Sequence, residues 1–180
     1  MRAFFRFKLL TLSKKATFRT LISSLYWKYS SAGKGILITA KGYPDMQTRQ
    51  FLRFISLRYP KLPIYALMDF DPDGIAIMAT YKFGSIKSSY QKNYTVPQIE
   101  WIGIKSNVIL HFLETSQGLQ ILSARDRRLA IKMLERVRVM EWKEELQIML
   151  MLNLKAEIQI LGNSNSLCQW LDFNLLNGSL

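Results

Sequence analysis

The residues best suited to chemistry are two aspartates, Asp69 and Asp71, in the turn DFDPDG over residues 69–74. Magnesium takes hard oxygen ligands, and proteins commonly supply one or two carboxylates while water or phosphate completes the shell. Two carboxylates two positions apart in a tight turn can point at one ion. Gly74 allows a close backbone approach, and the helix that it opens favours anions at its N-terminus. Beside a phosphodiester, such an ion would polarise a phosphoryl oxygen.

The alternative is a solvated acidic turn in which Pro72 and Gly74 act only as turn formers. The spacing DxDxxG is a moderate signal, and it does not fit a calcium loop, which needs twelve residues and a terminal glutamate. The position of the turn favours the metal interpretation, because it directly follows a buried apolar run over residues 64–68.

Four apolar runs predict the strands that position this turn, at residues 7–12, 36–39, 64–68 and 99–104. The second is expected to be buried on both faces. Ser13 and Asp45 are expected to cap the helices that follow the first two strands, and Gly74 to open the third. The apolar positions expected on the first two helices are Phe18, Leu21, Ile22, Leu25 and Tyr29, then Phe51, Leu52, Ile55 and Leu57.

This alternation of strand and helix predicts an α/β fold with a mostly parallel sheet flanked by helices. Sites in such sheets form beyond the carboxyl ends of the strands. Three of those ends carry polar residues, at Ser13, at residues 41–45 and at residues 69–73. We therefore expect these three segments to meet.

From Ser123 onward the pattern is helical. Ser123 and Asp126 resemble a capping arrangement, and further helices are predicted at residues 141–152 and 155–161, with a loop at 162–166. We expect one domain over residues 5–161, with these helices as its C-terminal helical extension. Residues 162–180 are expected to form a C-terminal loop and short segment.

The net charge of +12 is concentrated in the first third of the chain, where residues 1–60 hold twelve Lys and Arg against one acid, Asp45. Such a field attracts polyanions, so a phosphate-facing surface is favoured over a merely solvated one. The basic residues expected on that surface are Arg19, Lys28, Lys34, Lys41, Arg49, Arg53 and Arg58.

Composition excludes several classes of protein. The single cysteine, Cys168, cannot form a disulfide framework and suggests a reducing compartment. Together with the single histidine, His111, it excludes a zinc site of the usual ligand count. No apolar stretch approaches the length of a transmembrane helix, so no membrane partner is expected. Residues 1–44 contain no acid and resemble a mitochondrial presequence, although the predicted strands favour a structural role for them.

Several motifs, in order, resemble the Toprim domain of topoisomerase VI A subunits and their meiotic relatives, which make the programmed DNA double-strand breaks that start recombination. The resemblance extends from about residue 7 to residue 161 and is closest to the meiotic branch. Its motifs are KGYPD at residues 41–45 with Thr48 and Arg49, LMDFDPDG at 67–74, YKFGS at 81–85, WIG at 101–103, ARDRR at 124–128 and KAE at 155–157.

The resemblance implies that Asp69 and Asp71 bind Mg²⁺, and that the loop with Lys41 and Tyr43, together with Arg49, lies near the DNA path. Ser13 stands where the family has the glutamate that would be a third metal ligand. Serine is a neutral, weak ligand, so we expect weakened magnesium binding. No residue is expected to be catalytic in this chain, because the family's winged-helix domain with its nucleophilic tyrosine does not precede residue 7.

The resemblance also implies a nuclear, chromosomal protein that binds DNA, forms a homodimer and works with a topoisomerase VI B-like subunit. The intact family cleaves DNA by tyrosine transesterification, and we expect this chain to be inactive alone. The alternative is a degenerate, non-catalytic DNA-binding or interaction module. A receiver-like signalling domain is disfavoured, because it needs an acidic pair after the first strand, where this chain has Ser13, Lys14 and Lys15.

Overall fold

A four-stranded parallel sheet forms the centre of the computed structural model, which describes residues 7–84, 94–113 and 117–177. Its strand order is β2-β1-β3-β4, with all three neighbouring pairs parallel. The strands are β1 (Lys8–Leu12), β2 (Gly35–Thr39), β3 (Ile64–Met68) and β4 (Glu100–Gly103). The predicted parallel α/β sheet and its four strands are therefore confirmed.

The two middle strands form the core of the sheet. Every residue of β1 and β3 is buried, whereas every residue of β2 is only partly buried. The expectation that residues 36–39 are buried on both faces is wrong, because β2 pairs only with β1 and forms one edge of the sheet.

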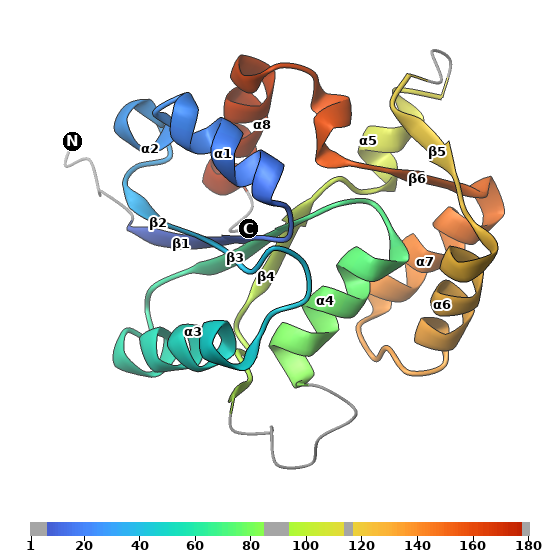
Figure 1. Cartoon of the computed structure of the whole chain (residues 1–180), viewed down its shortest axis with the longest axis horizontal. Coiled ribbons are helices and arrows are strands. Elements are labelled where there is room, and N and C mark those ends of the chain that lie inside the picture. The colour runs from blue at the N-terminus through green and yellow to red at the C-terminus, as the bar shows by residue number, and fades with distance from the viewer. Residues whose placement is uncertain (1–6, 85–93, 114–116, 178–180) are drawn as a thin grey trace.

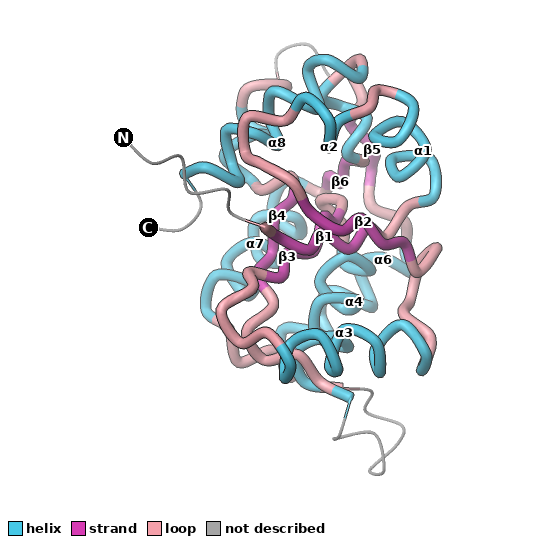
Figure 2. The backbone as a smooth tube through the Cα atoms, turned by 90° about the vertical axis from the view of Figure 1, so that its left-hand side faces the viewer, coloured by secondary structure: helices cyan, strands magenta, loops and turns pink. Residues whose placement is uncertain are grey.

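Helices cover both faces of the sheet (Figure 1). On one face lie α1 (Lys15–Ser23), α2 (Tyr26–Tyr29) and α8 (Ser164–Asn177), and on the other α3 (Met46–Arg58) and α4 (Pro72–Phe83). Figure 2 shows the same layers from the side, with the strands between them. Helix α6 (Ala124–Leu134) packs against α4 and against α7 (Met140–Leu152), and α5 (Ser106–Leu110) contacts α7. No described helix is long and apolar enough to span a bilayer.

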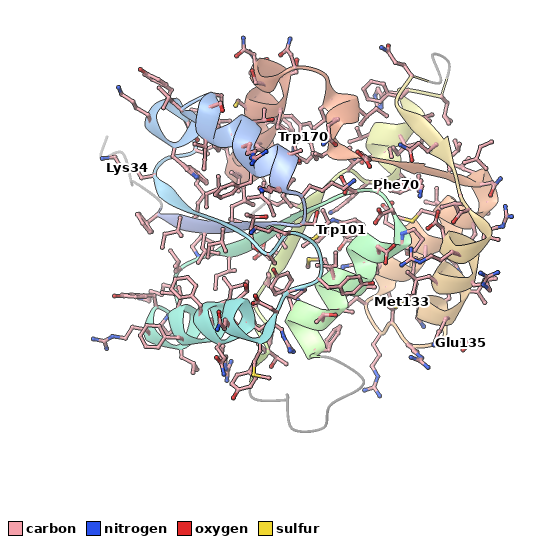
Figure 3. All side chains as sticks on the ribbon, viewed as in Figure 1. Lys34, Phe70, Trp101, Met133, Glu135 and Trp170 are labelled. Atoms are coloured by element: carbon pink, nitrogen blue, oxygen red, sulfur yellow. The ribbon has the colours of Figure 1, made fainter. Side chains whose placement is uncertain are left out.

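A second, two-stranded antiparallel sheet joins β5 (Leu119–Ile121) to β6 (Leu154–Ala156). Phe70, which is labelled in Figure 3, is fully buried, and it exchanges two backbone hydrogen bonds of 2.9 and 3.0 Å with Ala156. The helix predicted over residues 155–161 is wrong. This pairing with the acidic turn draws the segment into β6, which is followed by a 3-10 helix, η2 (Ile158–Leu161).

The loop and short segment expected beyond residue 161 are also wrong over Ser164–Asn177, which form α8. Leu167, Leu171 and Leu175 recur every four residues and are buried in the main core. The Asn and Ser residues of the segment predicted a loop, but burial of these three leucines against the core stabilises a helix instead.

The helix caps were predicted in part. Asp45 caps α3 by accepting from the Thr48 N–H, and Ser123 and Asp126 form a reciprocal capping box on α6. Ser13 is not a cap, because α1 begins after Lys14 and no side chain caps it.

Five of the nine apolar side chains expected on the first two helices are exposed rather than core-facing. For Leu25 and Tyr29 the reason is a break in the helix after Ser23, since Leu25 adopts a positive φ of 52° that separates α1 from α2. The exposed residues are Ile22, Leu25, Tyr29, Phe51 and Leu57.

Candidate functional site

The carboxyl ends of β1, β2 and β3 meet around one cavity of about 310 Å³. The predicted convergence of the three strand ends is thus confirmed, since Ser13, Tyr43 and both aspartates contribute to the same walls. Helix α6 adds a residue that follows much later in the chain. The lining residues are Ser13, Lys14, Gly42, Tyr43, Asp69, Asp71, Asp73, Gly74, Ile77 and Arg125.

Asp69 is held in a nearly fully buried position at the end of β3. Its Oδ1 accepts a hydrogen bond of 2.8 Å from the Ile158 N–H, and its Oδ2 lies 3.4 Å from Lys14 Nζ. Burial raises the pKa of this carboxyl, while the Ile158 N–H and the Lys14 ammonium oppose that rise. Burial without a full set of donors makes a carboxylate receptive to a cation.

Asp71 is the N-cap of α4, and its Oδ1 accepts from the Gly74 N–H at 2.5 Å. Burial raises the pKa of Asp71 to about 6; the Gly74 hydrogen bond lowers it, and the charges of Asp69 and Asp73 raise it further. A Cβ on Gly74 would lie 2.7 Å from the Asp69 carbonyl oxygen, so glycine is required for this close approach. The close backbone approach expected at Gly74 is therefore confirmed, but Gly74 does not open the helix, because α4 begins at Pro72 after the Asp71 cap.

Asp73, the third acid of the turn, faces a different set of partners. Its carboxylate accepts from Arg125 Nη1 at 2.6 Å and from Nη2 at 3.1 Å, and from the Tyr43 hydroxyl at 2.9 Å. This arrangement ties α4, α6 and the loop after β2 together. We did not single out Asp73 or Arg125 from the sequence as site residues, although Arg125 lies in the motif ARDRR.

Lys14 and Glu157 also belong to the site and were not predicted as site residues. Lys14 Nζ contacts Glu157 Oε1 at 2.5 Å, so the ammonium sits between Glu157 and Asp69. The bridge between Phe70 and Ala156 brings Glu157 to this place. Local sequence periodicity carries no signal for such a pairing.

The donor set around the turn fits a magnesium ion held by few protein ligands. Asp69 supplies a buried carboxylate and Asp71 a partly buried one, and each uses one oxygen to accept from a backbone N–H. Ser13 adds only a neutral hydroxyl, whose Oγ is 3.5 Å from the Leu67 carbonyl oxygen. Within the described ranges no cluster of three His, Cys, Asp or Glu residues is arranged to hold a metal. An ion here would need water or phosphate to complete its shell.

The residues predicted to contact DNA occupy different environments. Lys41 is exposed and has a positive φ of 58°, and the side chain of Tyr43 is 51% exposed. Arg49 is only 4% exposed, within α3, so its expected position on a phosphate-facing surface is wrong. The sequence pattern missed this because Arg49 lies on the same side of α3 as Leu52 and Ser56, which are also buried.

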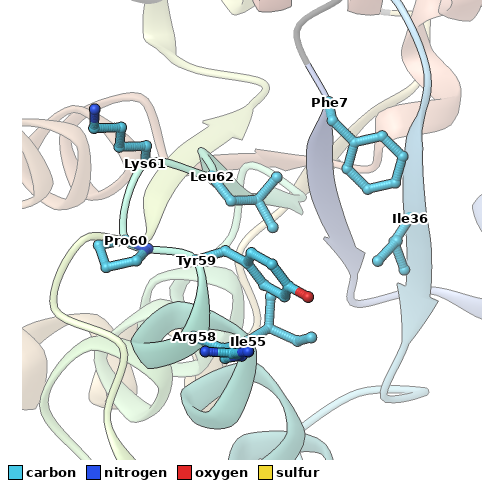
Figure 4. A pocket seen from close by; sticks show the side chains of 8 residues that line it. All are labelled: Phe7, Ile36, Ile55, Arg58, Tyr59, Pro60, Lys61 and Leu62. Carbon is cyan, nitrogen blue, oxygen red and sulfur yellow. The ribbon is translucent and has the colours of Figure 1, made fainter.

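A larger hollow of about 810 Å³ lies at the opposite, amino-terminal end of the strands (Figure 4). Its walls include Phe7 before β1, Ile36 near the start of β2, and Tyr59 and Leu62 before β3. These walls are mainly apolar, so this hollow offers no metal ligands and is separate from the acidic site.

The comparisons with known proteins identify the family of this chain. The sequence profile of the Toprim domain of Spo11 and of the topoisomerase 6 A-subunit matches residues 8–171. The chain is 37% identical over 159 residues to meiotic recombination protein SPO11-1 of Oryza sativa subsp. indica, an alignment that covers 86% of this chain and 41% of that protein. It is 39% identical over 132 residues to the A-subunit of DNA topoisomerase 6 from Arabidopsis thaliana, covering 71% of this chain and 31% of that protein.

Both alignments leave most of the relative unmatched, because this chain spans about two fifths of the first and a third of the second. The profile includes most of α8, in agreement with the packing of that helix on the core. On the profile match and the fold together, the chain belongs, through its Toprim domain, to the family of Spo11 and the topoisomerase 6 A-subunit.

Proposed function

We propose that this chain is the DNA-binding and magnesium-binding Toprim portion of a protein that makes meiotic DNA double-strand breaks. The observation that carries the proposal is the pairing of Asp69 and Asp71 at one strand end, inside a cavity that Lys14 and Arg125 also line. Carboxylates for a metal, beside cations for phosphate, are what a phosphodiester site requires.

Asp69 and Asp71 would hold the magnesium ion, which when bound polarises a phosphoryl oxygen and offsets developing charge. The chain's own part is to position DNA: Lys41 and Tyr43 lie on the loop at the cavity edge, and Gly74 keeps the acidic turn close to β3. In the reaction of the family, a tyrosine hydroxyl attacks the phosphorus of a phosphodiester, the bond from phosphorus to one deoxyribose oxygen breaks, and that oxygen leaves as a hydroxyl while the tyrosine becomes covalently linked to the DNA end. We assign that nucleophile to none of the tyrosines in the described Toprim fold.

The basic first third of the chain supports the assignment of DNA as the partner. Lys28, Lys34 and Lys41 are exposed, as are Arg19 and Arg58. Their combined field favours phosphate even where no single residue reads a base. By family membership we further propose a homodimer that works with a topoisomerase VI B-like subunit on chromosomes in the nucleus.

A second candidate is a degenerate, non-catalytic DNA-binding or interaction module. The observation that favours it is Ser13, which supplies a hydroxyl where a third carboxylate would complete the metal site. Both candidates are expected to bind DNA. Only the first is expected to bind magnesium, so magnesium binding distinguishes them.

Fluorescence anisotropy with a labelled DNA duplex tests the proposed function. We expect binding that weakens as salt rises, that tightens with Mg²⁺, and that Lys41→Ala weakens. Lys61→Ala is the matched control, because Lys61 is equally exposed but lines the hollow at the other end of the sheet. Absence of duplex binding at low salt, or equal losses in the two variants, would contradict the proposal.

A further inference from the structure

The guanidinium of Arg125 is engaged by Asp73 in the geometry that it would use for a phosphate. Two hydrogen bonds join the guanidinium to the two carboxylate oxygens, 2.6 Å from Nη1 to Oδ2 and 3.1 Å from Nη2 to Oδ1. Arginine binds carboxylate and phosphate through the same two-pronged arrangement. The Tyr43 hydroxyl adds a third donor, 2.9 Å from Asp73 Oδ1. An anion at this position therefore receives three hydrogen bonds from two elements.

This cluster lies at the outer part of the cavity. The Arg125 side chain is 64% exposed and that of Asp73 is 25% exposed, whereas Asp69 is buried. An exposed ion pair contributes little to stability, because water and salt screen it. The Arg125–Asp73 contact can thus be exchanged for another anion at low energetic cost, unlike the contacts of Asp69 deeper in the cavity.

We propose that Arg125 and Tyr43 form a phosphate-binding pair for the DNA backbone, and that Asp73 occupies it as an internal competitor. This inference rests on the proposed DNA-binding function. In the free chain the Asp73 carboxylate neutralises Arg125 and orients Tyr43. A backbone phosphate takes the place of the carboxylate when DNA binds, and Asp73 turns to solvent. Asp73 therefore weakens DNA binding while keeping the two donors in position.

The alternative is that the cluster only fastens α6 to α4 and to the loop after β2. The two interpretations predict opposite signs for Asp73→Asn. A structural clamp loses its charge-assisted bonds, so DNA binding weakens or stays unchanged. An internal competitor releases Arg125 in the free chain, so DNA binding becomes tighter while the number of phosphate contacts in the complex stays the same.

The test is the affinity of the full chain for a labelled duplex across a salt series. For Asp73→Asn we expect about three- to tenfold tighter binding at low salt, with an unchanged slope of log affinity against log salt, because the wild-type complex already contains the Arg125–phosphate contact. Glu144→Gln is the charge control, because Glu144 is exposed on α7 and does not line the cavity. It should change the affinity much less than Asp73→Asn does.

The double variant Asp73→Asn/Arg125→Ala decides the mechanism. If Asp73 acts through Arg125, the double variant should bind DNA no more tightly than Arg125→Ala alone. A general charge effect of Asp73 would still tighten binding there, and that result would overturn the proposal. The inference is also overturned if Asp73→Asn raises the affinity for DNA no more than Glu144→Gln does. In that case DNA binding by the wild type still supports the proposed function. If neither wild type nor any variant binds DNA, the proposed function and this inference both fail.

Arg125→Ala alone serves if Asp73→Asn does not fold, as judged by circular dichroism. It should weaken binding and make the salt slope shallower by about 0.9. An unchanged slope overturns the inference.

Discussion

Lys14 Nζ lies 3.4 Å from Asp69 Oδ2, so a fixed ammonium already faces one of the two carboxylates assigned to magnesium. The same ammonium contacts Glu157 Oε1. Burial lowers the pKa of Lys14, but the hydrogen bond with Glu157 and the charge of Asp69 outweigh burial and raise it overall. Lys14 is therefore charged at neutral pH, and in the proposed magnesium site it would compete with the ion for Asp69.

Replacing Lys14 by methionine removes that competing charge and keeps most of the side-chain volume. We expect magnesium to bind about three- to tenfold more tightly to Lys14→Met, because a cation within about 4 Å acts directly on the same carboxylate. Calorimetric titration with Mg²⁺ measures this. Lys15→Met is the matched control, since Lys15 is the next residue and is exposed. Equal affinities in the two variants would refute direct competition.

Ser13→Glu places a carboxylate at the end of β1, beside Asp69 and Asp71 in the same cavity. A third hard oxygen ligand should tighten magnesium binding by about tenfold or more. The same titration measures the change, and Ser13→Gln separates the ligand charge from the added volume. Identical affinity for Ser13→Glu and wild type would mean that Ser13 does not occupy a ligand position.

The sequence was sufficient to predict the sheet and the meeting of three strand ends, because buried parallel strands read as apolar runs and their carboxyl ends share an edge. Asp69 and Asp71 could be identified in this way. Glu157 could not, since it reaches the site through the backbone pairing of Phe70 with Ala156, 86 positions apart in the chain. Arg49 was assigned to the surface on its charge, but the face of α3 that it occupies is buried.

Gly74→Ala should distort the acidic turn. The added Cβ would lie 2.7 Å from the Asp69 carbonyl oxygen and 3.1 Å from Asp71 Oδ1, and backbone cannot yield as a flexible side chain can. We expect a loss of about 1–3 kcal/mol in the free energy of unfolding, measured by urea denaturation, together with weaker magnesium binding. Gly42→Ser is a useful contrast, because nothing lies within 4 Å of its added Cβ and only its positive φ resists substitution. Full stability and magnesium affinity in Gly74→Ala would show that the turn tolerates a side chain.

Asp172 attaches α8 to the corner between α2 and β2, and it should make the stability of the chain sensitive to acid. Its carboxylate accepts from the Tyr26 hydroxyl at 2.7 Å, from the Ser30 hydroxyl at 2.6 Å, and from the Ser31 N–H and hydroxyl at 2.9 and 2.7 Å. Burial alone would raise the pKa of Asp172, but these hydrogen bonds lower it overall. We expect Asp172→Asn to cost about 2 kcal/mol of unfolding free energy near pH 6.

Because the folded-state pKa of Asp172 is lowered, its stabilising effect is complete above the unfolded-state pKa of about 3.9, and it is lost as pH falls from there through the lower folded-state pKa. Urea denaturation at pH 6 and near pH 3 should therefore show the difference between wild type and Asp172→Asn shrinking in acid. Glu144→Gln, which changes an exposed carboxylate on α7, should show little difference at either pH. A constant gap for Asp172→Asn across this range would contradict the assigned role of the carboxylate.

The magnesium site itself is tested most directly by calorimetric titration of the wild-type chain and of Asp69→Asn/Asp71→Asn, with circular dichroism to verify that both are folded. The two carboxylates assigned as ligands are lost in the double variant, while amide oxygens still accept from the Ile158 and Gly74 N–H groups. We predict saturable binding of one Mg²⁺ by the wild type and its loss in the double variant. Binding retained in the double variant, or none in the wild type, would contradict the assignment of Asp69 and Asp71 as the metal site.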